Sequence, residues 1–412
     1  MNERQYRRYL AKIIVKNMSS SMRELLEIQT RVVLGEDPGP AAGIEAQLQW
    51  LCRAQDMSTT SDGGVARHFS LDTGWSASYP ETTGYIIPTL LRESRRIGHD
   101  DLHRRACRML DWLVSIQMGD GGFQGGTIVQ TPVVSVTFNT GQILIGLAAG
   151  VAVTDKPAYR DAMNRAARFL TTSQDSDGCW RRHRTPFAAH GDKAYETHVA
   201  WGLFEADRLE PGKGYGESGL AQVDWALQQQ RENGWFANNC LTDVDAPLTH
   251  TIGYVLRGVI EAYRLSGQSK YLEASIRTAE ALLDIIEPDG RLPGRLDARW
   301  KPAVEWACCT GIAQIAICWF MLSEITGRED FLAAARRANA FGRRTAMTID
   351  DRDVYGAVMG SWPFSGDYGR FEALNWAAKF TIDANCMELD RVNNRSVLQG
   401  LTKFWRVFSS MF

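Results

Sequence analysis

The sequence predicts an all-α protein in which six helical hairpins close into a ring around a central cavity, an (α/α)6 toroid. Two series of segments recur at nearly constant intervals along the 412 residues and support this prediction. The composition supports it as well, because 44% hydrophobic and 23% charged residues are ordinary for a chain that buries a large core.

The first series consists of short glycine turns, each of which follows a helical pattern. Its glycines are 56 to 58 residues apart, and Asp or Asn stands one or two residues before each of them. Such pairs favour a turn, because glycine adopts positive φ without steric cost and the Asx side chain bonds to nearby backbone. The turns are assigned to Gly64, Gly122, Gly178, Gly234 and Gly290.

The second series lies between these turns and is apolar around most of the helical circumference. Its members are ETTGYIIPTLL, FNTGQILIGLA, ETHVAWGLFEA, HTIGYVLRGVI and CCTGIAQIAIC, with a weaker sixth copy, FEALNWAAKF, near Asn375. Helices of this kind are buried on all sides. The segments before the glycine turns have charged and apolar faces at helical spacing, as expected of partly exposed outer helices. We align the inner helices on Thr83, Thr140, Thr197, Thr251 and Thr310.

The chain is predicted to divide into a basic amphipathic N-terminal helix, residues 1–36, and the ring, residues 37–412. The helix is expected to cap the ring, with contact to a membrane or to a partner complex as the alternative. We expect no signal peptide, because Lys12 and Lys16 interrupt the first apolar stretch and no small-residue cleavage site follows. We expect no membrane span, because no run of about 18 apolar residues is evident. A formal net charge of −2 does not point to nucleic acid. Eight scattered cysteines without a CxxC pair suggest reduced thiols in a cytoplasmic protein.

Two groups of motifs resemble known proteins. The helix ends Gln174–Trp180 and Gln230–Trp235 resemble a motif of the α/α-toroid superfamily, which includes terpenoid cyclases, prenyltransferase β-subunits, lanthionine cyclase-like proteins and (α/α)6 carbohydrate-active enzymes. The segments YPETTGY, FNTGQILIGL and YETHVAWGL resemble VpsJ-type proteins of bacterial exopolysaccharide biosynthesis. This resemblance implies a polysaccharide or lipid-linked oligosaccharide substrate and leaves the reaction open.

The candidate site consists of polar residues just before the aligned threonines, where the inner helices should converge on the cavity. A histidine, two carboxylates and two tyrosines are suited to acid–base work, although acidic residues at helix starts also favour the helix dipole. The candidate catalytic residues are His250, Glu196, Tyr195, Glu81 and Tyr79.

A second set of residues is expected to bind the substrate. Tryptophans stack on sugar rings, amides and carboxylates bond to hydroxyls, and arginines pair with carboxylate or phosphate, so the arginine-rich loops predict an anionic sugar. No cofactor and no metal are expected. The candidates are Trp75, Asn139, Glu305, Trp306, Arg181, Arg182, Arg295 and Arg299.

Proton abstraction is the preferred chemistry, because the C5 proton of a uronic acid is acidified by the adjacent carboxylate. Returning the proton to the other face gives epimerisation, and expelling the 4-substituent gives a lyase reaction. Paired carboxylates would instead hydrolyse a glycosidic bond. The sequence also leaves open an isoprenoid cyclase using DVDA at Asp243–Ala246, a zinc enzyme using Cys308, Cys309 and His250, and a non-catalytic glycan-binding scaffold.

Overall fold

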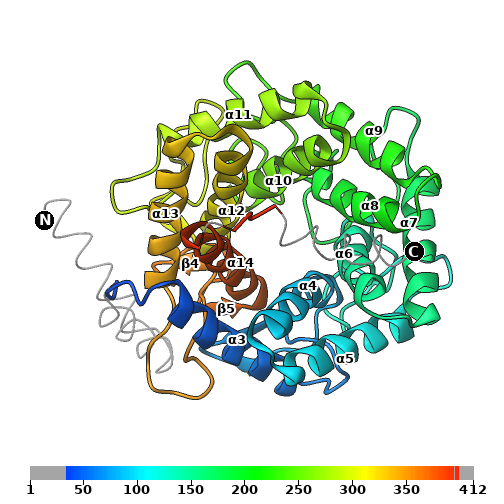
Figure 1. Ribbon diagram of the computed structural model, residues 1–412, viewed down its shortest axis with the longest axis horizontal. Helices are drawn as coiled ribbons and strands as arrows, with labels where there is room; N and C mark the ends of the chain where they lie inside the picture. The colour runs from blue at the N-terminus through cyan, green and yellow to red at the C-terminus, as the bar shows by residue number, and fades with distance from the viewer. Residues whose placement is uncertain (1–33, 394, 399–412) are drawn as a thin grey trace, which may run out of the picture.

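The computed structural model describes residues 34–393 and 395–398 and confirms the predicted ring of six helical hairpins. Figure 1 looks down the ring and shows an inner circle of helices surrounded by an outer one. The inner helices are α4 (Pro80–Ile97), α6 (Thr137–Val153), α8 (Thr197–Leu209), α10 (Thr249–Ser266), α12 (Cys309–Thr326) and α14 (Asn375–Val392). The outer helices are α3 (Pro40–Asp56), α5 (Asp100–Ile116), α7 (Pro157–Ser173), α9 (Tyr215–Leu227), α11 (Ser269–Leu283) and α13 (Glu329–Arg344).

Five hairpins follow the predicted order, in which an inner helix leads into the next outer helix. The sixth differs, because α14 packs against α3 from the other end of the described chain. Arg343 of α13 reinforces this closure through ion pairs of 2.6 Å with both Asp37 and Glu388. The predicted helix over residues 1–36 falls almost entirely outside the described residues.

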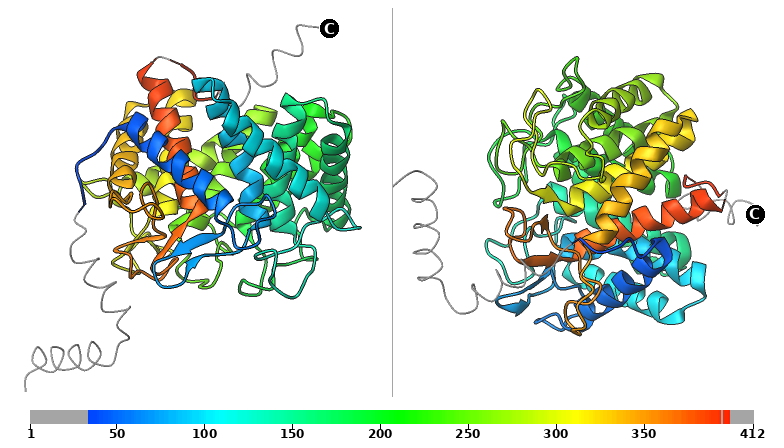
Figure 2. Two further views of the ribbon diagram at one scale, coloured as in Figure 1. Left: turned by 90° about the horizontal axis from the view of Figure 1, so that it is seen from below. Right: turned by 90° about the vertical axis from the view of Figure 1, so that its left-hand side faces the viewer.

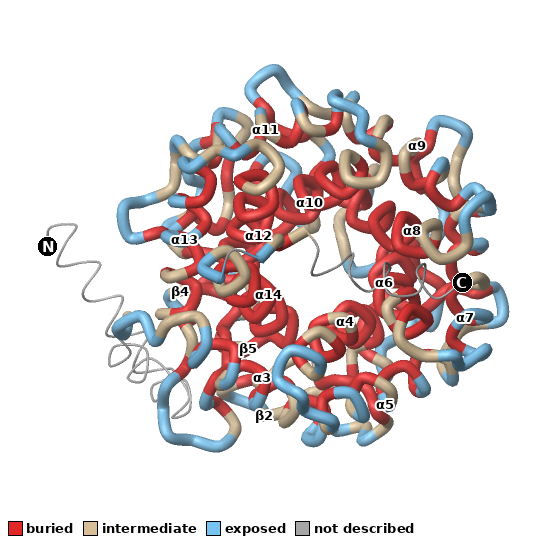
Figure 3. The backbone as a smooth tube through the Cα atoms, in the orientation of Figure 1, coloured by how far each residue is buried: buried red, intermediate tan, exposed pale blue. Residues whose placement is uncertain are grey.

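The inner helices approach one another through glycine. A Cβ on Gly146 of α6 would lie 2.1 Å from the carbonyl oxygen of Gly84 in α4, so any side chain there would separate the two backbones. Helix α12 is long and apolar enough, by composition, to cross a membrane, contrary to the expectation that no such run exists. Most of it is buried, however, as an inner helix of the ring. Figure 3 shows the same contrast between buried inner helices and exposed peripheral loops.

The glycine turns join each hairpin to the next. In the first two turns the glycines with positive φ are Gly63 and Gly121, which corrects the assignment to the glycines that follow them. The Gln of each motif also has a structural role. Gln174 donates from its side-chain amide to the carbonyls of Gly178, in its own turn, and of Ser218, on the next outer helix. Gln117 repeats this pattern one hairpin earlier.

Short strands organise the loops at the end where the inner helices begin. Strand β1 (His68–Ser70) pairs antiparallel with β2 (Gly74–Trp75) and with β5 (Glu372–Leu374), which joins the first and last hairpins. Strand β3 (Ala307–Cys308) pairs with β4 (Ser361–Trp362). A 3-10 helix, η1 (Ala194–Glu196), leads into α8. Figure 2 shows these strands gathered at one end of the ring.

Candidate functional site

A cavity of about 570 Å³ opens at the end of the ring where the inner helices begin. The second residue of five helical segments lines it, so these side chains form a circle around the cavity. They are Glu81, Phe138, Tyr195, His250 and Trp376, from α4, α6, η1, α10 and α14. A pocket of this size lined by aromatic rings and a few polar groups is typical of small-molecule sites.

Glu81 is a buried carboxyl group held by two neighbouring side chains. Its Oε2 accepts a hydrogen bond of 2.7 Å from the Tyr79 hydroxyl and one of 3.0 Å from Nδ2 of Asn139. Burial raises the pKa of Glu81 to about 7, although the Tyr79 hydrogen bond and the charge of Arg67 oppose the rise. Glu81 can therefore hold or release a proton near neutral pH.

His250 is buried in the same cavity and is kept neutral. Its Nδ1 lies 2.8 Å from Oε1 of Gln314, an acceptor, so Nδ1 carries the proton and Nε2 keeps its lone pair. Burial lowers the pKa of His250 to about 4. The ring also contacts Tyr254 and Tyr368, at centroid distances of 4.3 and 5.3 Å. At neutral pH Nε2 is therefore unprotonated and available as a proton acceptor, although burial makes it a weaker base than an exposed imidazole.

Tyrosine hydroxyls supply most of the remaining polar groups of the cavity. Burial raises the pKa of Tyr79, Tyr195, Tyr254 and Tyr368 well above the ordinary value of 10. These side chains are therefore protonated at neutral pH. Tyr79 donates to Glu81, and the hydroxyls of Tyr195, Tyr254 and Tyr368 can donate hydrogen bonds to a sugar. The Tyr368 hydroxyl itself accepts a bond of 2.9 Å from the indole of Trp376.

The sequence reasoning missed Arg67, which lines the cavity beside β1. Its guanidinium donates to Glu372 across the sheet, at 3.0 Å, and lies 5.3 Å from the ring centre of Trp376. Neighbouring His68 is neutral, because burial, and to a lesser extent the charge of Arg67, lower its pKa to about 4. Arg67 stands after a glycine turn and outside the arginine-rich loops, so composition gave no signal for it.

Glu196 does not line the cavity, although its neighbour Tyr195 does. It is buried with no hydrogen-bond partner for Oε2. Burial raises its pKa to about 8, against the charges of Arg184 and Lys193. The structure thus brings His250, Glu81, Tyr79, Tyr195 and Asn139 together around one cavity and leaves Glu196 outside it. The catalytic and binding roles assigned to these six residues stay predictions.

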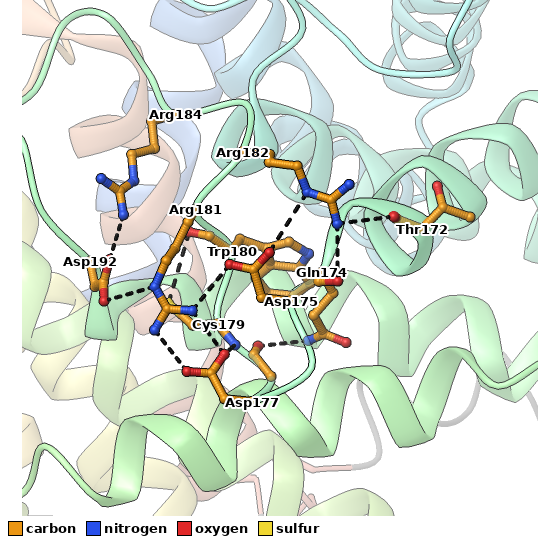
Figure 4. Close-up of polar contacts among 11 residues, drawn as sticks. Thr172, Gln174, Asp175, Asp177, Cys179, Trp180, Arg181, Arg182, Arg184 and Asp192 are labelled. Carbon is orange, nitrogen blue, oxygen red and sulfur yellow. Dashed lines mark hydrogen bonds and ion pairs between the residues drawn. The ribbon is translucent and has the colours of Figure 1, made fainter.

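The arginines of the segment 181–184 form ion pairs with nearby aspartates, as Figure 4 shows. Arg181 contacts Asp175, Asp177 and Asp192 at 2.7 to 3.2 Å. Arg182 lies 3.7 Å from Asp175 and also donates to backbone carbonyls. Neither arginine lines the cavity. Their positions favour a role in holding the loop together over the predicted contact with substrate.

The remaining predicted binding residues also lie outside the cavity lining. Trp75 packs against Trp50 and Phe69 and donates its indole N–H to Asp353. Arg295 donates to the carbonyl of Ala246 and to Thr242. Arg299 is exposed beside Asp297. Glu305 and Trp306 line a second groove at the same end of the ring.

The structure also places the residues that the zinc and cyclase hypotheses invoke. Cys308 and Cys309 are both buried at the start of α12, and the Cys308 sulfur accepts a hydrogen bond of 3.4 Å from the amide of Gly311. Within the described part of the chain, no three His, Cys, Asp or Glu side chains gather as a metal site. In the DVDA segment, Asp243 accepts bonds from the backbone of its own loop.

Comparisons with known proteins bear on the fold. No protein-family model matches the chain, and the curated proteins give no significant match. A crystal structure of an unsaturated glucuronyl hydrolase specific for heparin superposes with a TM-score of 0.68 at 14% identity, covering 87% of this chain and 98% of that one. Cellobiose 2-epimerase from Bacillus thermoamylovorans gives 0.67 at 12% identity, with 84% and 96% covered. D-mannose isomerase gives 0.67 at 11%, with 85% and 97% covered.

At such identities these similarities establish the fold alone, which is the predicted (α/α)6 toroid. The resemblance to VpsJ-type proteins stays a prediction.

Proposed function

We propose that the protein is a carbohydrate-active enzyme that moves a proton at a carbon next to a carbonyl or carboxylate group of a sugar. One observation carries the proposal: Glu81 and neutral His250 line the same cavity from α4 and α10, which stand three hairpins apart on opposite sides of the ring (Figure 1). A base and an acid on opposite walls match epimerisation, in which a proton leaves one face of a carbon and returns to the other.

In this mechanism Nε2 of His250 removes the proton, and the electron pair delocalises onto the adjacent carbonyl or carboxylate oxygen. Protonated Glu81 returns a proton to the opposite face, and Tyr79 and Asn139 hold its carboxyl group in place. Arg67 is the one positively charged side chain among the described residues that line the cavity, which favours an anionic sugar such as a uronate as the substrate. Aromatic rings around the cavity provide stacking surfaces.

Solved structures of similar fold include a cellobiose 2-epimerase and a D-mannose isomerase, which supports a sugar substrate. Hydrolysis by paired carboxylates has less support, because Glu81 is the single carboxylate among the described residues that line the cavity. A place in bacterial polysaccharide metabolism in the cytoplasm, on a polysaccharide or lipid-linked oligosaccharide, belongs to the proposal as its wider setting.

The test is proton exchange in deuterium oxide, followed by NMR and mass spectrometry. The sugars are cellobiose, mannose, oligogalacturonate and oligomannuronate. We expect the wild type to introduce deuterium next to the carbonyl or carboxylate of at least one sugar. Glu81→Gln and His250→Ala should lower that rate by about 10²- to 10⁴-fold, while the exposed-residue controls Glu217→Gln and His103→Ala keep it. The proposal fails if no sugar exchanges, or if both cavity variants exchange at the wild-type rate.

A further inference from the structure

A second groove, of about 650 Å³, opens at the same end of the ring as the cavity. It is formed by the loops that lead into α12 and α14, over residues 287–306 and 363–366. The loop before α14 also carries Tyr368, which lines the cavity, so one connection separates the two sites. The proposed proton-transfer mechanism uses no residue of this groove.

Trp306 is a half-buried ring in the wall of the groove. Two glycines leave room for it: a Cβ on Gly294 would lie 2.2 Å from the ring, and one on Gly366 would lie 2.9 Å from it. The backbone beside the ring is also fixed, because the amide of Gly294 donates to the carbonyl of Trp306 at 2.7 Å. The indole is therefore held in one place before any ligand arrives, which lowers the entropic cost of stacking.

The charged side chains around the Trp306 indole favour a neutral, hydroxyl-rich ligand. Glu287 and Glu305 are exposed carboxylates, and each can accept hydrogen bonds from sugar hydroxyls. Arg291 is the one basic residue among the described residues of the groove, and it donates to the backbone carbonyl of Glu305 at 3.4 Å. Two carboxylates against one guanidinium disfavour a uronate. Prolines and Val304 provide most of the rest of the wall, as apolar surface.

We propose that this groove binds neutral sugar residues of a glycan, stacked on Trp306 and hydrogen-bonded to Glu287 and Glu305. The proposal shares with the proposed function only the class of ligand, a carbohydrate. The groove would hold a neutral stretch of a long chain, while the cavity acts on a sugar that reaches Arg67. Binding at the groove is expected to persist when Glu81 is inactivated.

The test is affinity electrophoresis of the full-length protein in native gels that contain galactomannan, xyloglucan, dextran or polygalacturonate. We expect at least one neutral polymer to retard the wild type, and Trp306→Ala to raise its apparent Kd at least tenfold. The matched control Tyr355→Ala removes an exposed aromatic ring outside the groove and should bind as the wild type does. Glu81→Gln should bind normally too, which separates this result from the proposed function.

A second variant covers the case in which Trp306→Ala fails to fold. Glu287→Ala combined with Glu305→Ala changes only exposed side chains, so the Tm should stay within a few degrees while binding weakens. The proposal is overturned if no neutral polymer retards the protein, if polygalacturonate alone does so, or if both groove variants bind as the wild type. Loss of binding in Glu81→Gln would also overturn it, because the polymer would then occupy the cavity.

Discussion

Replacing Glu81 with Gln should make the protein more stable at alkaline pH and leave its stability nearly unchanged at acid pH. The folded protein holds the Glu81 pKa at about 7, whereas the ordinary value is 4.5. The native state therefore binds more protons than the unfolded state between these values, and wild-type stability falls as the pH rises through that window. At about 1.4 kcal/mol per pKa unit, the full penalty above pH 7 is about 3 kcal/mol.

The Gln side chain avoids this penalty while preserving the local contacts. Oε2 of Glu81 accepts from both Tyr79 and Asn139, and the amide oxygen of Gln can accept the same two hydrogen bonds. Other groups with perturbed pKa values, such as His250, are present in both proteins, so their contributions cancel in the difference. The comparison between the two proteins thus isolates the titration of one carboxyl group.

The assay is urea unfolding of both proteins at pH 5, 6, 7 and 8, followed by tryptophan fluorescence. The free energy of unfolding of Glu81→Gln, minus that of the wild type, should grow by about 2–3 kcal/mol from pH 5 to pH 8. A difference that stays constant within about 0.5 kcal/mol over this range would refute the raised pKa and, with it, the role of Glu81 as a proton donor near neutral pH.

Three further predictions concern the turns and the cavity. Gly290→Ala should lower the free energy of unfolding in urea by about 3 kcal/mol or more, because Gly290 has positive φ and its Cβ would lie 2.0 Å from a backbone oxygen. Gly327→Ala, also at positive φ but with open space around it, should lower it by about 1 kcal/mol, and equal losses would contradict the packing argument. Gln174→Leu should cost about 2–3 kcal/mol, since two backbone carbonyls lose their donor, and a thermal melt unchanged from the wild type would show that the Gln does not join the hairpins. Arg67→Ala should raise KM for an anionic sugar at least tenfold in steady-state kinetics while Arg104→Ala, exposed on an outer helix, leaves it unchanged; an unaltered KM in both would remove the support for an anionic substrate.

The ring itself could be predicted because each repeat carries its own turn and its own apolar helix. The spacing of the repeats was predicted correctly even in the two turns, at Gly63 and Gly121, where the assigned glycine was one residue too late. The pairing of α14 with α3 was not predicted, because two helices separated by most of the chain share no local sequence signal.

The site was only partly predictable, because successive residues of a helix point about 100° apart. An alignment error of one residue therefore selects a different side chain. The threonine alignment slips at the fourth copy: Thr251 is the third residue of α10, whereas Thr83 and Thr140 are the fourth residues of their helices. Counted from the helix starts, His250 is equivalent to Tyr195 and Glu81, at the second position. Glu196 occupies the third position and lies outside the cavity, whereas Asn139, at the third position of α6, lines it. Helix starts cannot be located to one residue from sequence alone.

The pairing of α3 with α14 also bears on how the chain folds during synthesis. Helix α3 ends at Asp56, and its partner begins at Asn375. At about 5–20 residues per second, the ribosome needs roughly 15–60 s to make the sequence between them. The completed ring buries Ile44, Leu48 and Trp50 of α3. Throughout that interval this face of α3 lacks the packing that α14 provides in the native structure. An open solenoid could consolidate repeat by repeat, whereas this ring must keep its first hydrophobic face from aggregating until its last helix has emerged.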